Sequence, residues 1–143
     1  MRKMYVAAAA AAVLVVALAP RLARAQDWQP PSRQMPQMPA MSELDGGWRG
    51  SLGAWFAGTG TAVAEVRAAG EAGGSRARMV RFLGGVRPVA VWTDRNGDGR
   101  CDMIEIFRGG ARVAQLIDAD YDGTANALRL YDASGALARE ERL

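Results

Sequence analysis

The residues with the clearest chemistry lie in one twelve-residue stretch, DRNGDGRCDMIE, at 94–105. Oxygen-bearing side chains stand at its positions 1, 3, 5, 9 and 12, which are Asp94, Asn96, Asp98, Asp102 and Glu105. Calcium takes about six to eight oxygen ligands, and a glycine at position 6 permits the sharp bend that turns alternate side chains inward around one ion. The stretch therefore predicts a calcium site, with the backbone carbonyl of Arg100 at position 7 as a further ligand.

The pattern returns 24 residues later in DADYDGTANALR, at 118–129. Its oxygen donors are the side chains of Asp118, Asp120, Asp122 and Asn126 and the backbone carbonyl of Thr124. Position 12 is now Arg129, and a cation cannot ligate calcium, so we expect this second site to be weaker and to complete its shell with water or a neighbouring segment. Asp, Asn and Gly also form ordinary turns without metal. Because the same acidic pattern returns at a fixed period, metal binding is favoured over ordinary turns. The metal could also serve only to stabilise the fold.

The acidic loops belong to a longer internal repeat. Residues 94–117 align with 118–141, and 79–93 aligns with the strand part 103–117, although the loop before it keeps only Glu71 of the acids. Short repeats that cannot bury an apolar face alone are typical of units stacked on a common core.

The segments between the loops have the alternation of β-strands. MIEIF at 103–107 and ALRLY at 127–131 reach Gly- or Asp-rich turns too soon for a helix, which needs about ten residues. We predict a mainly β fold, an antiparallel sheet of stacked hairpin repeats of about 24 residues joined by the calcium loops, with closure into a barrel or a small sandwich as alternatives. The expected buried face consists of Val80, Phe82, Ile104, Ile106, Leu128 and Leu130. Trp48, Trp55 and Phe56 are expected to cover it.

Residues 92–141 resemble the calcium-loop repeats D-x-[DN]-x-D-G-x-x-[DN] of EF-hand-like proteins, including bacterial exported proteins in which such loops join β-strands. The resemblance implies calcium binding and no further activity. Two tandem loops are also similar to dockerins, but the apolar helix after each loop is missing here. A cohesin partner is therefore not expected, and Glu105, which a helix would swing inward, can point away from the loop on a strand.

The first 25 residues have the pattern of a secretory signal peptide: basic Arg2 and Lys3, an apolar run, and small residues at Ala23 and Ala25. Removing 1–25 takes four of the 18 basic residues and none of the 15 acidic ones, which leaves a net charge of −1. We therefore expect a periplasmic or secreted protein with no nucleic-acid partner and no stable membrane insertion after cleavage.

Residues 26–44 are rich in Pro, Gln and Met and lack helical or strand periodicity, which predicts a disordered linker before a β-repeat domain at 45–143. Met35, Met38 and Met41 recur at every third position within it. Thioethers bind Cu(I), so a periplasmic copper-binding protein is an alternative function.

The residue inventory argues against an enzyme. The chain has no histidine and a single cysteine, Cys101, expected as a small buried hydrophobe. A carboxylate-based hydrolase using Glu65, Glu71, Glu105 or Asp132 is a further alternative, but their spacing selects no pair. The favoured hypothesis is a calcium-binding domain with a structural or interaction role in the bacterial envelope or outside the cell, where another protein would be its partner.

Overall fold

The structure is a computed structural model that describes residues 28–44, 51–56, 59, 61, 66–72 and 74–143. The predicted signal peptide at 1–25 lies outside these residues. No helix in the described part of the chain is long and apolar enough to cross a membrane.

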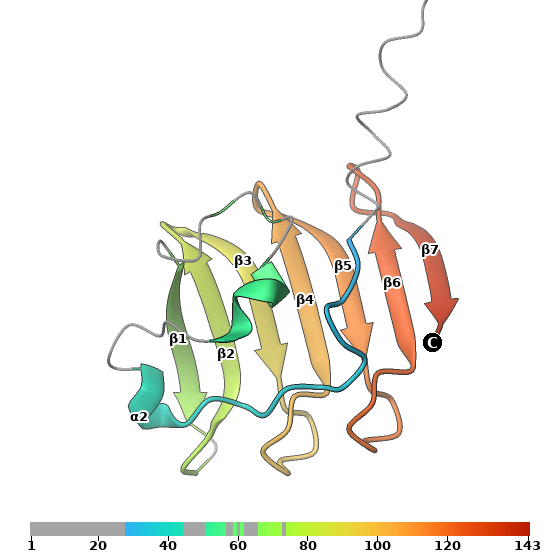
Figure 1. The fold of residues 1–143 in the computed structure, drawn as a ribbon. Helices are drawn as coiled ribbons and strands as arrows, with labels where there is room; N and C mark the ends of the chain where they lie inside the picture. The colour runs from blue at the N-terminus through green and yellow to red at the C-terminus, as the bar shows by residue number, and fades with distance from the viewer. Residues whose placement is uncertain (1–27, 45–50, 57–58, 60, 62–65, 73) are drawn as a thin grey trace, which may run out of the picture.

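The described residues form an open antiparallel sheet of seven strands that follow one another in chain order (Figure 1). The strands are β1 Val66–Ala72, β2 Ala77–Gly84, β3 Arg87–Thr93, β4 Met103–Arg108, β5 Ala111–Ile117, β6 Ala127–Tyr131 and β7 Leu137–Arg142. Two short helices accompany them, α2 Met41–Leu44 and the 3₁₀ helix η2 Ser51–Phe56. The predicted stacked hairpins are confirmed. Because β1 and β7 remain at opposite edges, the sheet is not closed into a barrel.

The repeat gives the two ends of the sheet different characters. Tight turns that join β2 to β3, β4 to β5 and β6 to β7 lie at one end, and the acidic loops that join β3 to β4 and β5 to β6 lie at the other (Figure 1). Each 24-residue step therefore contributes one hairpin, and it places equivalent loop positions side by side.

One face of the sheet carries the core, as predicted. The six residues expected there are all fully buried. The strand register aligns Val80 with Trp92, Trp92 with Ile104, Ile104 with Leu116 and Leu116 with Leu128, so one apolar row crosses five strands. Burying each such side chain contributes roughly 1.5–3 kcal/mol, which fixes the face that each strand presents.

Aromatic side chains outside the sheet cover this row. Trp55 meets Trp92 edge-on with ring centroids 6.1 Å apart, and Phe56 lies 4.9 Å from Phe82. Both covering residues belong to η2, which confirms their predicted place. Trp48 lies outside the described residues.

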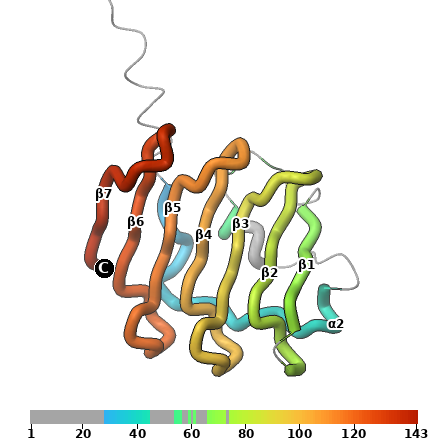
Figure 2. Tube along the Cα trace, turned by 180° about the vertical axis from the view of Figure 1, so that it is seen from behind, coloured from blue at the N-terminus to red at the C-terminus, as the bar shows by residue number. Residues whose placement is uncertain are grey.

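The expectation of a disordered linker is wrong for residues 28–44. We call residues 28–41 the strap: it first lies along β5 and β6 on the core face and then crosses the loop end of the sheet towards α2 (Figure 1). Trp28, Met35 and Met38 of the strap are buried in the core. The segment has no helical or strand periodicity because its partners are three separate loops rather than a neighbouring strand. Seen from behind, the sheet has its other face free of the strap and of α2 (Figure 2).

Candidate metal centre

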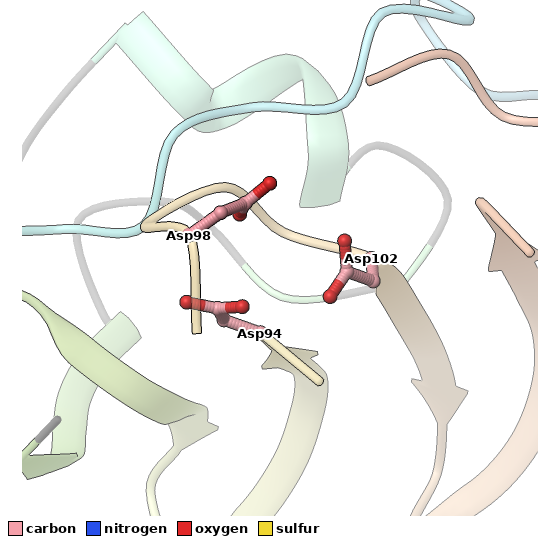
Figure 3. Close-up of side chains that lie close together, drawn as sticks. All are labelled: Asp94, Asp98 and Asp102. Carbon is pink, nitrogen blue, oxygen red and sulfur yellow. The ribbon is translucent and has the colours of Figure 1, made fainter. Parts of the chain in front are cut away.

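The first acidic loop brings three carboxylates together. One oxygen from each of Asp94, Asp98 and Asp102 lies within 4.8 Å of the others, a spacing that could hold a metal ion (Figure 3). Asp94 directly follows β3 and Asp102 directly precedes β4, so the ends of two paired strands fix them, whereas Asp98 comes from the exposed tip.

Backbone N–H groups shape this loop from inside. Asp94 accepts hydrogen bonds from the N–H groups of Gly97, at 2.7 Å, and Gly99, at 2.9 Å. Asp102 accepts from the N–H groups of Arg95 and Asn96 at 2.6 and 3.2 Å. Both oxygens of Asp94 are therefore used inside the protein.

Asn96 and Arg100, also predicted as ligands, lie beside Asp98. The Asn96 amide donates to one Asp98 oxygen at 3.3 Å, and the Arg100 N–H donates to the other at 2.8 Å. The Asp98 side chain therefore ties together loop positions 3, 5 and 7, the positions whose oxygens would face a shared ion.

The second loop repeats this scaffold. Asp118, Asp120 and Asp122 also bring one oxygen each within 4.8 Å of one another. Gly123 donates its N–H to Asp118 at 2.8 Å, and Thr124 donates to Asp122 at 2.7 Å, as Gly99 and Arg100 do in the first loop.

Asn126 takes the place of Asp102 in this second loop. Its side-chain oxygen accepts the N–H of Ala119 at 3.1 Å, as Asp102 accepts that of Arg95. A neutral amide therefore performs the structural task of the carboxylate at position 9.

The two loops also differ in the hydrogen bonding of one carboxylate oxygen. Asp118 is fully buried, and its Oδ1 has no hydrogen-bond partner, whereas the equivalent oxygen of Asp94 accepts from Gly97. Tyr121 replaces Gly97 in the sequence and takes up the same left-handed conformation, at φ 62° against 80°. Its N–H lies against the Asp118 carboxylate and lowers the pKa of that carboxyl, but its geometry falls short of the hydrogen bond that Gly97 makes to Asp94. A buried carboxylate oxygen without a donor is costly and has the chemistry of a cation ligand.

Burial changes the acidity of both inner carboxyls. Desolvation raises the pKa of Asp102, against the N–H groups of Arg95 and Asn96, which lower it. Desolvation likewise raises the pKa of Asp118, and the side chain of Asp120 raises it further while the Gly123 N–H opposes the shift. Each loop therefore holds negative charge in a place that disfavours it, and a bound cation would relieve this cost.

Glu105 does not belong to the centre, which corrects its assignment as a ligand. It lies in β4 next to Gln115 in the strand register, and its Oε2 accepts from Arg112 at 3.0 Å and from Gln115 at 3.1 Å. Arg129, the position-12 residue of the second loop, pairs with Glu140 in the same way, at 2.6 Å. On a strand, three residues beyond position 9 bring the side chain to the opposite face of the sheet.

Arginines are the neighbours that sequence reasoning missed. Arg76 and Arg78 lie against Gly99 and Gly97 of the first loop, and Arg78 also donates to the carbonyls of Asp94 and Arg95. Arg100 of the first loop lies against Gly123 of the second. Arg76 and Arg100 are 24 residues apart in the sequence, and this spacing could have placed them at equivalent positions of neighbouring loops.

The described residues of the alternative sites have structural partners of their own. Met35 and Met38 have 5% and 0% of their surface exposed and belong to the hydrophobic core, so their thioethers are not free for Cu(I). Among the acids considered for hydrolysis, Glu71 pairs with Arg81 in β1 and β2, while Asp132 caps the β6–β7 turn. Glu65 lies outside the described residues.

No family model, no curated protein and no solved structure matches this chain.

Proposed function

We propose that this protein is an exported calcium-binding β-repeat domain, in which the metal stabilises the loops that join successive hairpins. The observation that carries the proposal is the second loop, where Asp118, Asp120 and Asp122 bring one carboxylate oxygen each within 4.8 Å of one another. In the same loop, Asp118 Oδ1 is buried without a hydrogen-bond partner. Oxygen-only ligands of this kind suit calcium or magnesium rather than the softer transition metals.

Calcium is the better fit of these two ions. Magnesium requires a near-octahedral shell at short distance, whereas calcium accepts a variable number of oxygens in a flexible loop. Because the position-12 residues face the opposite side of the sheet, each ion would take three side chains, one backbone carbonyl and water. An incomplete protein shell implies modest affinity, about 10⁻⁴ to 10⁻³ M, which is the range of extracellular calcium modules.

The signal peptide and the calcium requirement support each other. Millimolar calcium is available outside the cytoplasm, where a modest site would be filled. We propose that the domain acts through binding or structure. We propose an envelope or extracellular protein as its partner.

A calorimetric titration of chelator-treated residues 26–143 with calcium tests this function. Two sites are expected, with Asp98→Ala removing one and Asp122→Ala the other, because each residue supplies a carboxylate to one loop only. Asp132→Ala is the matched control, since Asp132 lies in a turn at the opposite end of the sheet. Absence of heat up to several millimolar calcium would reduce both loops to acidic turns.

A further inference from the structure

The strap has a three-residue period that matches the 24-residue period of the sheet. Residues 33–41 read RQM, PQM and PAM. The middle residue of each tripeptide forms an isolated antiparallel bridge with loop position 7: Gln34 with Thr124, Gln37 with Arg100, and Ala40 with Arg76. Three residues of strap therefore correspond to one hairpin of the sheet.

Chain geometry explains this match. One hairpin adds two strands, which spans about 9.6 Å at roughly 4.8 Å per strand. Three residues of a polyproline-type chain advance about 9.3 Å, at roughly 3.1 Å each. An extended strap can therefore cross successive hairpins and meet each loop with the same atoms.

The hydrogen bonds repeat accordingly. The carbonyl of the first residue in each tripeptide accepts from the N–H at loop position 8, at 2.7 Å for Arg33 with Ala125 and 2.9 Å for Pro36 with Cys101. The N–H of the third residue donates to the carbonyl at position 6, at 2.9 Å for both Met35 and Met38. The third tripeptide makes the same pair of bonds with Ala77 and Ser75. Proline fits the first place because no N–H is used there.

The loop residue between these two contacts faces the carboxylates. The N–H of Arg100 donates to Asp98, and that of Thr124 donates to Asp122. Successive carbonyls of an extended chain point in opposite directions, so the carbonyl at position 7 points away from the strap. Positions 6 and 8 thus hold the strap, while position 7 offers its carbonyl to the proposed ion.

We propose that strap docking regulates the calcium sites: strap binding and calcium binding at the same loop strengthen each other. This inference rests on the calcium-binding function proposed above. A docked strap fixes the backbone at positions 6 and 8 and so orients the position-7 carbonyl, and a bound ion fixes the same backbone from the other side. By linkage, each event favours the other by the same factor. Loss of calcium would loosen the strap and uncover the core around Met35 and Met38.

The molecule contains its own control. The loop that joins β1 to β2 holds the third tripeptide through Ser75 and Ala77, and its described residues include no carboxylate. Calcium should therefore strengthen the strap at Met35 and Met38 and leave it nearly unchanged at Met41.

Hydrogen exchange of unmodified residues 26–143, measured by NMR in chelator and in saturating calcium, tests the coupling. The Met35 and Met38 amides should exchange about 5- to 150-fold more slowly with calcium, the usual range of coupling between sites. The Met41 amide and the Gly135 amide of the β6–β7 turn should change much less. Equal change at Met35, Met38 and Met41 would overturn the inference.

Calorimetry on the same sample separates this failure from failure of the proposed function. Calcium binding with no selective protection removes the coupling alone, and absence of binding removes both. As a second arm, deleting Gln37 breaks the three-residue phase and should weaken calcium binding by the same factor, whereas Gln37→Ala keeps the phase and should leave affinity unchanged. A folded deletion variant with normal affinity contradicts the inference, and if that variant does not fold, the exchange data on the unmodified chain decide.

Discussion

The two acidic loops share a backbone scaffold but differ in how far the protein satisfies its own carboxylates. In the first loop, Gly97 and Gly99 donate to both oxygens of Asp94. In the second, Gly123 donates to only one oxygen of Asp118 and the other is buried without a partner. Arginines lie against both loops, Arg76 and Arg78 at the first and Arg100 and Arg33 at the second, so they do not explain this difference.

From this difference we expect the opposite ranking of calcium affinity to the one that the sequence suggests. A count of template positions favours the first loop because it has a glutamate at position 12, but Glu105 faces the other side of the sheet. The remaining contrast is the unsatisfied oxygen of Asp118, so we now expect the second loop to bind calcium more tightly. A ligand that the fold already satisfies has less to gain from an ion.

The largest predicted effect is a change of sign between equivalent substitutions. Asp118→Asn should stabilise the chelator-treated protein by about 1 kcal/mol, because it removes a buried charge with too few donors. Asp94→Asn should destabilise it by roughly 1–3 kcal/mol, because an amide NH₂ would face an N–H donor. Urea unfolding in chelator measures both. Destabilisation of similar size by both substitutions would show that the loops are equivalent.

Calcium should reverse the sign of the stability change caused by Asp118→Asn. In saturating calcium, Asp118→Asn should become the less stable protein, since it lacks a ligand of the tighter site and gains less from mass action. Asp132→Asn is the control, because Asp132 bonds only within its own turn and its effect should not depend on calcium.

The raised pKa of Asp118 predicts a pH dependence in chelator. A carboxyl whose folded pKa exceeds its unfolded value binds more protons when folded, so stability falls as pH rises from about 3.9 through the folded pKa. The Asp118→Asn variant should lose the part of this decline that comes from Asp118 and keep the part from Asp102, whose pKa is also raised, and calcium at neutral pH should offset the decline. Unfolding curves from pH 4 to 7 for both proteins provide the test. Parallel curves would mean that Asp118 does not contribute.

Substitutions at loop position 4, where Gly97 and Tyr121 have a left-handed backbone conformation, should change the stability by a smaller amount. Gly97→Ala should destabilise the protein by about 1 kcal/mol because a side chain is strained at this φ. Tyr121→Gly should be nearly neutral or stabilising by less than about 1 kcal/mol, because relief of strain is offset by greater freedom of the unfolded chain. Thermal unfolding measures both. Strong destabilisation by Tyr121→Gly would indicate that the tyrosine ring contributes more than its conformation.

The smallest effect is expected at position 12. Glu105→Gln and Arg129→Gln should each leave calcium affinity within about twofold of the parent, because both side chains form pairs on the opposite face. Calorimetry measures this directly. A tenfold loss with Glu105→Gln would restore the helical calcium-loop geometry and contradict the strand assignment.

Much of the fold could be predicted from the sequence because strand patterns depend on residues that are close together in the chain. The alternation in MIEIF and ALRLY determines which side chains share a face, and a 24-residue period places Ile104 and Leu128 on the same side. The carboxylate clusters were predictable for the same reason, since a short loop keeps Asp118, Asp120 and Asp122 close whatever surrounds it.

The sequence by itself determined the strands, the repeat and the acids of each loop, because all three depend on residues near one another in the chain. Only the tertiary structure decided the face of Glu105, the isolation of the Asp118 oxygen and the place of the strap. The tripeptides RQM, PQM and PAM carry no strand or helix pattern, since their partners are loops spaced by two strand widths. Their order comes from contacts up to 92 residues apart, as between Arg33 and Ala125, which a local pattern does not encode.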